Sequence, residues 1–539
     1  MSARLILPRT PKERKTMSAD LVLRGGSVLD GTGTAARRAD VAIAGDRIEA
    51  IGDVRDADAP VLDAEGCVVA PGFINVLSHA YETLQLDPRG LSDIYQGITT
   101  EIFGEGRSMG PVTGRMTDLA AAEPPLFGMR TSWPRLDDFL TDLSGTGLNI
   151  GSFVGAENLR MPFAGNEDRP LTDDELTAAC ALLDEELTAG ALGVGSALIY
   201  APGSYASTEE LIAYARVLAK HDALYISHIR SESARLVESV DELIRIARET
   251  SARAEIYHLK ASGQQNWPLM STVLERIHQA RAEGLGITAD IYPYDAGSTF
   301  LSAFIPPRFH EGGELAARFG SPSIREEIKA AILDPRQDWE NLYLGSGGAE
   351  GILLLGVGSA SVRPGQTLAE ASRGPDPLDT LLDLVAAEPK LMVAEFTASE
   401  ADTRRALKQP WVSVCTDSEA IAAEAPFTDT STHPRTYGAF ARVLGPWVRE
   451  GVLPLEEAVR RMTSLPASNL RLVDRGVLRP GAFADVAVFD PAAVQDNATY
   501  LDPHRYADGM RHVLVNGQPA LQDGKPTGVL AGRAVRRAS

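Results

Sequence analysis

His228 and His258 each stand at the end of a short apolar segment, LYISH (Leu224 to His228) and AEIYH (Ala254 to His258). They are thirty residues apart, which is about the length of one strand and one returning helix. Neighbouring parallel strands with this spacing present both imidazoles at the edge where α/β barrels build active sites. Because neutral imidazoles are typical ligands of Zn²⁺, the spacing predicts a metal site. The alternative is that two unrelated histidines happen to end strands.

Asp417 follows another predicted strand, WVSVC, in the segment VCTDSE. A carboxylate at this edge can touch the metal, act as a general base toward a water that zinc has acidified, and later protonate a leaving amine. The alternative is a helix N-cap, where aspartate is favoured. The two histidines at the same edge favour the catalytic interpretation.

His79, in PGFINVLSHA, and Glu105, in TTEIFGEG, follow the first two predicted barrel strands. Imidazole and carboxylate are ligand types that a catalytic zinc uses. A lone glutamate in a glycine-rich loop is more often a solvated turn residue. Whether Glu105 can bind a metal therefore depends on which way its loop turns. Both residues are candidate metal ligands.

Two basic residues are candidates for holding a substrate. Lys260 lies two residues beyond His258, where it could polarise a carbonyl or bind a carboxylate, although most such lysines are simply solvated. Arg435, in THPRTYG, carries the planar guanidinium that suits a two-pronged contact with a carboxylate. Loop arginines often make only structural bonds.

The middle of the chain alternates predicted strands and helices at about thirty-residue spacing. Thr172 with Glu175, and Ser207 with Glu210, form patterns that open helices, and further helices are expected near 234–250 and 270–284. This rhythm predicts an α/β fold, a TIM (β/α)8 barrel, with the doubly wound open sheet as its competitor. No glycine-rich nucleotide motif follows an early strand, which weakens the nucleotide-binding alternative.

Short β-rich segments flank this middle part. We expect residues 19–72 and 475–539 to form a small β-sandwich from the N- and C-terminal segments, around a catalytic barrel at 73–474. The rhythm is lost at about 306–389, which predicts an insertion or lid. Residues 1–18 are basic but lack an apolar region and a cleavage site, and we expect a disordered tail.

Composition excludes several classes of partner. The net charge of −21 argues against nucleic acid and anionic membranes, and no apolar stretch approaches the roughly 18 residues of a membrane span. The three cysteines, Cys67, Cys180 and Cys415, form no disulfide framework, so a cytoplasmic location is expected. The expected partner is a small-molecule substrate, and an oligomer is compatible with the sequence.

Several motifs together resemble one known family. They are LVLRGGSVLDGTG, VVAPGFI, GITTEIFG, ASTEELIAYARVL, YISHIRSES, IYHLKASG, DIYPYDAGSTF, THPRTYGAFARVLG, RGVLRPGAFADVAVFDP and HVLVNG, spread from about residue 20 to 537. On these motifs the chain is similar to the amidohydrolase superfamily and, within it, to the D-aminoacylases (N-acyl-D-amino-acid deacylases). The resemblance implies a TIM barrel with a terminal β-sandwich and metal-assisted cleavage of the amide in N-acyl-D-amino acids.

The resemblance also implies roles for single residues. His228 and His258 match the tightly bound zinc ligands of the family, and Asp417 matches its catalytic aspartate. Four residues match positions that hold the substrate's carboxylate and carbonyl: Lys260, Tyr292, Ser298 and Arg435.

The sequence departs from the family at two positions. The family usually has His-x-His after PGFID, whereas this chain has Leu77-Ser78-His79, and leucine cannot bind a metal. Gly106 stands where the family supplies a cysteine ligand, and Glu105 immediately precedes it. We therefore expect Glu105 to replace the thiolate, and one tightly bound Zn²⁺ rather than two.

The leading hypothesis is a single-zinc deacylase of N-acyl-D-amino acids. A second hypothesis keeps the chemistry but changes the substrate to a cyclic amide, a lactone or another N-acyl compound. A third is a barrel that has lost its metal and serves as a non-catalytic scaffold. Arg435 discriminates between the first two, because a substrate without a free carboxylate does not need it.

Overall fold

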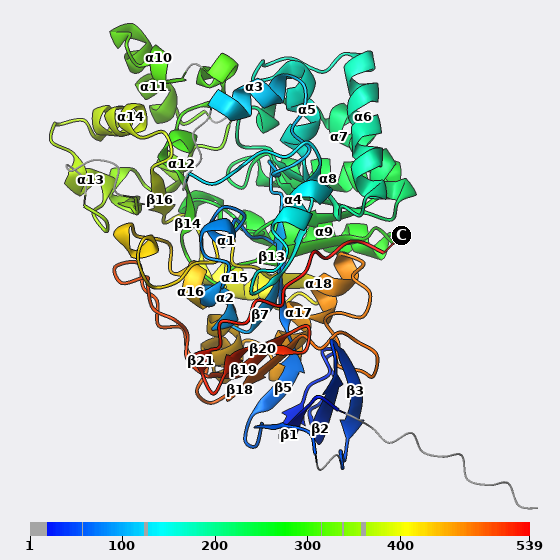
Figure 1. Ribbon diagram of the computed structural model, residues 1–539. Coiled ribbons are helices and arrows are strands. Elements are labelled where there is room, and N and C mark those ends of the chain that lie inside the picture. The colour runs from blue at the N-terminus through cyan, green and yellow to red at the C-terminus, as the bar shows by residue number, and fades with distance from the viewer. Residues whose placement is uncertain are drawn as a thin grey trace, which may run out of the picture.

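The computed structural model describes residues 19–55, 58–122, 128–313, 315–336, 339–356 and 363–538 (Figure 1). The predicted disordered tail at 1–18 lies outside the described residues. Strands and helices alternate through most of the chain, so the fold is α/β.

Two sheets of parallel strands occupy the middle of the molecule. The larger sheet has six strands in the order β17-β13-β12-β11-β10-β9. The smaller sheet has the order β6-β7-β8. The strands are β6 (Phe73–Asn75), β7 (Ile98–Phe103), β8 (Asn149–Ser152), β9 (Val154–Gly155), β10 (Gly193–Ala197), β11 (Leu224–His228), β12 (Arg253–Ile256), β13 (Ile287–Ile291) and β17 (Val412–Val414).

The predicted helices are present between the strands of the larger sheet. They are α6 (Asp173–Thr188), α7 (Thr208–Lys220), α8 (Leu236–Thr250) and α9 (Leu269–Ala282). Thr172 and Glu175 form the predicted capping box, and the Ser207 side chain accepts from the Glu210 backbone N–H. In α8 the buried residues recur three and four positions apart, as in Val240, Leu243 and Ile244, because one face of the helix packs against the sheet.

Further helices surround these sheets in the described chain. They are α1 (Thr83–Leu86), α2 (Leu91–Ile94), α3 (Arg115–Ala122), α4 (Leu136–Asp142), α5 (Ala156–Ala164), α15 (Glu400–Leu407), α16 (Arg435–Arg442), α17 (Leu455–Met462) and α18 (Ser464–Asn469).

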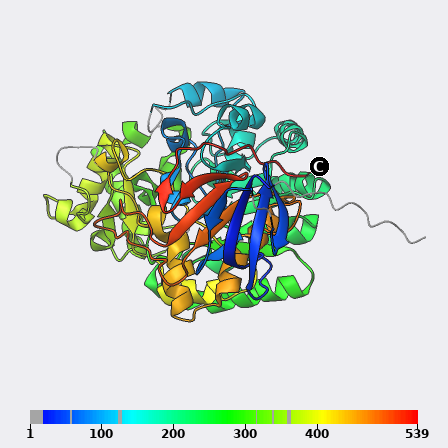
Figure 2. The ribbon, with the colours of Figure 1, turned by 60° about the horizontal axis from the view of Figure 1, so that its bottom comes forward.

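Both chain ends contribute to one nine-stranded sheet. Its strands are β1 (Leu21–Val28), β2 (Arg37–Ala44), β3 (Arg47–Gly52), β4 (Val61–Asp63), β5 (Val68–Pro71), β18 (Val486–Phe489), β19 (Met510–Val515), β20 (Gln518–Gln522) and β21 (Lys525–Pro526). Antiparallel pairing of β5 with β18 joins the two ends, and Figure 2 shows the N-terminal strands beside the C-terminal ones. Asn516 and Gly517 both have positive φ, the conformation that a two-residue hairpin between β19 and β20 requires.

A separate α/β segment follows β13. Its antiparallel sheet has the order β14-β16-β15, and it lies at the upper left of Figure 1 with its helices. A core of its own includes Leu301, Phe304, Ile328 and Leu381. The elements are β14 (Gly297–Phe300), α10 (Leu315–Arg318), α11 (Pro322–Leu333), α12 (Leu342–Gly345), β15 (Ile352–Leu354), α13 (Leu368–Ala371), α14 (Pro377–Ala387) and β16 (Met392–Glu395).

Two predictions from composition can be compared with the structure. All three cysteines are free thiols, so no disulfide framework is present. Within the described residues, every helix is too short or too polar to cross a bilayer.

Candidate active site

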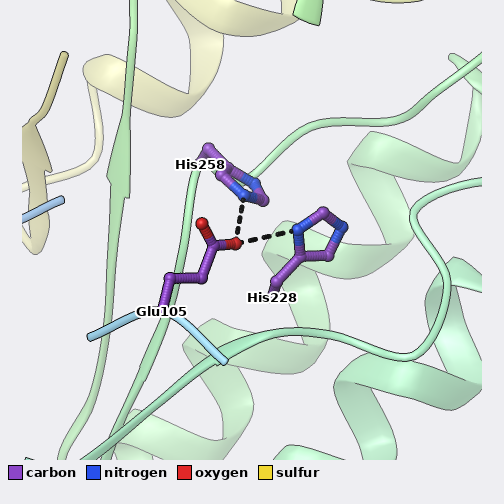
Figure 3. A group of neighbouring side chains, drawn as sticks. All are labelled: Glu105, His228 and His258. Carbon is purple, nitrogen blue, oxygen red and sulfur yellow. Dashed lines mark hydrogen bonds and ion pairs between the residues drawn. The ribbon is translucent and has the colours of Figure 1, made fainter. Parts of the chain in front are cut away.

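Glu105, His228 and His258 meet at the carboxyl ends of three strands (Figure 3). Glu105 Oε1 lies 3.0 Å from His228 Nδ1 and 3.4 Å from His258 Nε2. The three side chains are almost fully buried. The spacing of the two histidines thus predicts their meeting correctly, and the glutamate faces them rather than solvent.

Local backbone geometry turns Glu105 inward. It follows β7 between Gly104 and Gly106, which have φ of 106° and 65°. A Cβ at Gly104 would lie 2.4 Å from the carbonyl oxygen of Phe153, so a larger residue there would collide with the neighbouring chain. The two glycines therefore let the chain pass close to Phe153 and aim the carboxylate at the histidines.

The histidines are brought together by neighbouring strands. His228 closes β11, which pairs in parallel with β12. β12 ends at Ile256, so His258 lies two residues past the strand rather than at its last position. It has a φ of 34°, an unusual conformation for a residue with a side chain and one that occurs at functional sites. The imidazole ring centroids are 4.4 Å apart.

Asp417 and His79 form a second group with Glu105. His79 Nε2 lies 3.0 Å from Asp417 Oδ1 and 3.3 Å from Glu105 Oε2. Asp417 also has a left-handed backbone, with φ of 53°, and its N–H donates to the carbonyl of Leu77. It is not a helix N-cap, because no helix begins within the described segment 418–426. Glu105 is shared by both groups.

The charges within the combined cluster favour an ionised Glu105 and protonated imidazoles on His79 and His258. Burial opposes ionisation of Glu105, but hydrogen bonds from His228, His258 and His79 outweigh it and hold its pKa well below the usual range. Burial likewise opposes protonation of His79 and His258. Their carboxylate neighbours nevertheless raise both imidazole pKa values to about 10. Carboxylates that hold protons on these rings would equally attract a divalent cation.

The donor set fits a divalent metal ion. Each group offers three ligand atoms within 4.8 Å of one another, from imidazole nitrogens and carboxylate oxygens. These are the N and O ligands that catalytic zinc sites use, with a remaining position for water or substrate. Leu77, which replaces a histidine of the family pattern, is 1% exposed and packs in the hydrophobic core.

Arg435 links Asp417 to the remaining predicted residues. Its Nη1 lies 2.8 Å from Asp417 Oδ2, and its Nη2 donates to the carbonyl of Ser298 at 3.4 Å. The guanidinium carbon is 4.6 Å from the centre of the Tyr292 ring, and Lys260 Nζ is 5.6 Å from the same centre. Arg435 and Lys260 therefore both lie near the Tyr292 ring, and Ser298 contributes its backbone carbonyl.

The Asp417–Arg435 pair sets the charge state of the aspartate. Burial raises the pKa of Asp417, but the charge of Arg435 and the hydrogen bond from His79 outweigh it, so the pKa stays below the usual range. A low pKa keeps the carboxylate ionised at neutral pH, which is the state in which it can accept a proton.

Glu232 is a site residue that sequence analysis missed. Its Oε1 is 2.9 Å from His258 Nδ1, and its Oε2 is 2.6 Å from Lys260 Nζ. Carboxylates commonly orient metal-binding histidines in this way. A signal was present, because Glu232 lies in the YISHIRSES motif four residues after His228.

Glu395 is a second missed residue. It is the last residue of β16 and is 5% exposed. The positive charges of Arg435 and Lys260 act to lower its pKa. No spacing in the sequence connects it to the site, because its place depends on the pairing of β16 with β14.

Comparisons with known proteins agree with this geometry. The profile of the Amidohydrolase family matches residues 401–521. The chain is 34% identical to a D-aminoacylase of Alcaligenes xylosoxydans xylosoxydans over 96% of this chain and 98% of that protein. It is also 34% identical to an N-acyl-D-glutamate deacylase of the same organism, with 96% of both chains covered.

A solved structure shares the fold across its whole length. It is the N-acyl-D-glutamate deacylase from Bordetella bronchiseptica, complexed with zinc and a phosphonate inhibitor that mimics the tetrahedral intermediate of the reaction. The TM-score is 0.78 at 30% identity, with 96% of this chain and 100% of that chain covered. The resemblance inferred from the motifs is thereby confirmed. The chain belongs to the D-aminoacylase (N-acyl-D-amino-acid deacylase) family of the amidohydrolase superfamily.

Proposed function

We propose that the protein is a zinc-dependent hydrolase that cleaves the amide bond of N-acyl-D-amino acids to a carboxylate and a free D-amino acid. The observation that carries this proposal is that a group of metal-ligand side chains lies next to a buried ion pair. The Glu105–His228–His258 cluster adjoins an aspartate that is paired with a buried arginine. The cluster suits a metal ion, and the Asp417–Arg435 pair suits proton transfer and an anionic substrate.

One tightly bound Zn²⁺ would be held by Glu105, His228 and His258. A zinc ion there would polarise the amide carbonyl and acidify water. His79 and Asp417 share Glu105 with this cluster, but the buried Leu77 removes a ligand that the family pattern provides. This favours one tight site over two equal ones.

Asp417 would carry the proton during the reaction. Its ionised carboxylate would take a proton from the attacking water and deliver it to the leaving amine nitrogen. Arg435 would keep Asp417 ionised until the proton arrives, because the two groups form a close ion pair.

Arg435 and Lys260 would also hold the free carboxylate of the substrate. Both lie near the Tyr292 ring, and Ser298 anchors the guanidinium through its carbonyl. Among the described residues, Arg435 Nε is buried and has no hydrogen-bond partner, so it is free to donate to a bound carboxylate. A fixed carboxylate beside a fixed amide would set the chirality that the site accepts.

We propose further that the two parallel sheets form one closed (β/α)8 barrel. β8 runs almost directly into β9, and Ser78 and Ser418 form a parallel bridge between the segments that follow β6 and β17. In this arrangement the nine-stranded terminal sheet corresponds to the predicted sandwich domain. The segment at about 306–389 would serve as a lid over the site.

A comparison of acid and carboxamide substrates tests the role of Arg435. We expect wild-type enzyme to prefer N-acetyl-D-methionine over N-acetyl-D-methioninamide. In Arg435→Lys the ratio of the two kcat/KM values should fall at least about tenfold, because lysine keeps the charge but loses the two-pronged geometry. The measurement is steady-state kinetics on both substrates.

The ratio separates two effects of the same substitution. A disturbance of Asp417 slows both substrates equally and leaves the ratio unchanged. An unchanged ratio would therefore contradict carboxylate recognition by Arg435. It would also favour a substrate without a free carboxylate, such as a cyclic amide or a lactone.

A further inference from the structure

Glu395 lies inside the proposed substrate site, and it forms no ion pair with any residue that the structure describes. It closes β16 opposite Gly297 of β14, and its side chain is almost fully buried. Among the described residues, its Oε2 atom has no hydrogen-bond partner. Burying a carboxylate without a partner is costly, so such a group in a native structure calls for an explanation.

The two cations of the site are already engaged. Lys260 Nζ lies 2.6 Å from Glu232, and Arg435 Nη1 lies 2.8 Å from Asp417. Burial raises the pKa of Glu395 to about 8, although the charges of Arg435 and Lys260 pull it down. The positive charge nearby is thus insufficient to compensate this carboxylate.

Gly297 places the Glu395 carboxylate beside Tyr292. A Cβ on Gly297 would lie 2.0 Å from Glu395 Oε1 and 3.2 Å from the Tyr292 hydroxyl. The missing side chain therefore makes room for the carboxylate near the hydroxyl of Tyr292, whose ring also lies near Arg435 and Lys260. In the proposed function those two cations hold the substrate's α-carboxylate, so Glu395 lies where groups next to that carboxylate would be found.

We propose that Glu395 is a specificity residue that binds a cationic, hydrogen-bond-donating side chain of the substrate, as in N-acyl derivatives of D-arginine and D-lysine. The inference rests on the proposed function and narrows its substrate class. A guanidinium or ammonium group would supply the missing counter-ion and donors. An acidic substrate side chain supplies neither a counter-ion nor donors, and it would repel Glu395 whenever that carboxylate is ionised.

The test compares N-acetyl-D-arginine with N-acetyl-D-citrulline, which has nearly the same shape but no charge. For the zinc-loaded wild-type enzyme, kcat/KM should be about 10- to 100-fold higher for N-acetyl-D-arginine than for N-acetyl-D-citrulline. In Glu395→Gln this ratio should fall at least about tenfold. Glu350→Gln, the same change at an exposed glutamate of the same segment, should leave it unchanged.

Three results would overturn the inference. The first is equal kcat/KM of the wild type for N-acetyl-D-arginine and N-acetyl-D-citrulline. The second is an unchanged ratio of these two values in Glu395→Gln. The third is a preference of the wild type for N-acetyl-D-glutamate. The last result would mean that Glu395 acts as a neutral donor toward a carboxylate.

A binding measurement on the wild type and Glu395→Gln separates this inference from the proposed function and needs no turnover. Calorimetric binding of free D-arginine and D-citrulline to the zinc-loaded wild type should show the same preference for the cation, and Glu395→Gln should lose that preference. If none of the N-acetyl-D-amino acids is hydrolysed, the proposed function fails. The binding preference would then still support or overturn the role of Glu395.

Discussion

Asp417→Asn is expected to lower kcat about a thousandfold while the protein keeps its tightly bound metal. Asparagine is nearly the same size as aspartate but cannot take a proton from water, and positioned acid–base groups contribute about 10²–10⁴ in rate. The metal should stay because Glu105, His228 and His258 form a complete three-ligand group without Asp417. Steady-state kinetics and metal analysis of the purified variant measure the two effects.

Asp429→Asn is the matched control, because Asp429 is an exposed aspartate in the loop that follows Asp417. This control should keep wild-type activity and metal content. Near-normal turnover in Asp417→Asn would contradict proton transfer by Asp417. Loss of the metal from this variant would instead show that Asp417 is needed to hold the ion.

Glu105→Ala is expected to weaken zinc binding at least about a hundredfold. Removing a partner that only orients a metal ligand typically costs 10–100-fold in affinity, so losing a direct ligand should cost at least as much. The shared position of Glu105 between both donor groups makes the loss larger than for a residue of one group. Competition with a chelator of known affinity measures the change.

Glu424→Ala provides the control, since Glu424 is exposed and pairs with Arg89 on the surface. It should bind zinc like the wild type. If Glu105→Ala also bound zinc normally, Glu105 would not be a ligand. The metal would then depend on His228, His258 and another group.

The parallel core and its histidines could be predicted because they depend on local patterns. LYISH is a buried strand, and AEIYH contains the buried end of β12 followed by the turn that carries His258. The capping residues Thr172 and Ser207 fix where two of the helices begin. Strands that are one helix apart and parallel must present their ends at one edge, which is why His228 and His258 meet. The sequence leaves open whether Glu105 faces the histidines or solvent. Its inward direction depends on the close approach of Gly104 to Phe153, which is distant in the sequence.

Glu395 could not be predicted because no local pattern determines its place. β16 reaches the site through pairing with β14, and the two strands are separated by almost one hundred residues of irregular rhythm. A shift of one residue in this register would turn Glu395 to the other face of the sheet. The sequence motif predicts Ser298 at the site, but it does not predict that the backbone carbonyl of Ser298, rather than its side chain, contacts Arg435.

The chirality of the released amino acid tests the proposed function most directly. Zinc-loaded protein, with chelator-treated protein as its control, would be incubated with paired N-acetyl-D- and N-acetyl-L-amino acids that carry basic, neutral and acidic side chains. Chiral chromatography would then identify the product. Release of D-amino acids alone, dependent on the metal, is the predicted result. Release of L-amino acids, or no release from any pair while zinc is bound, would contradict it.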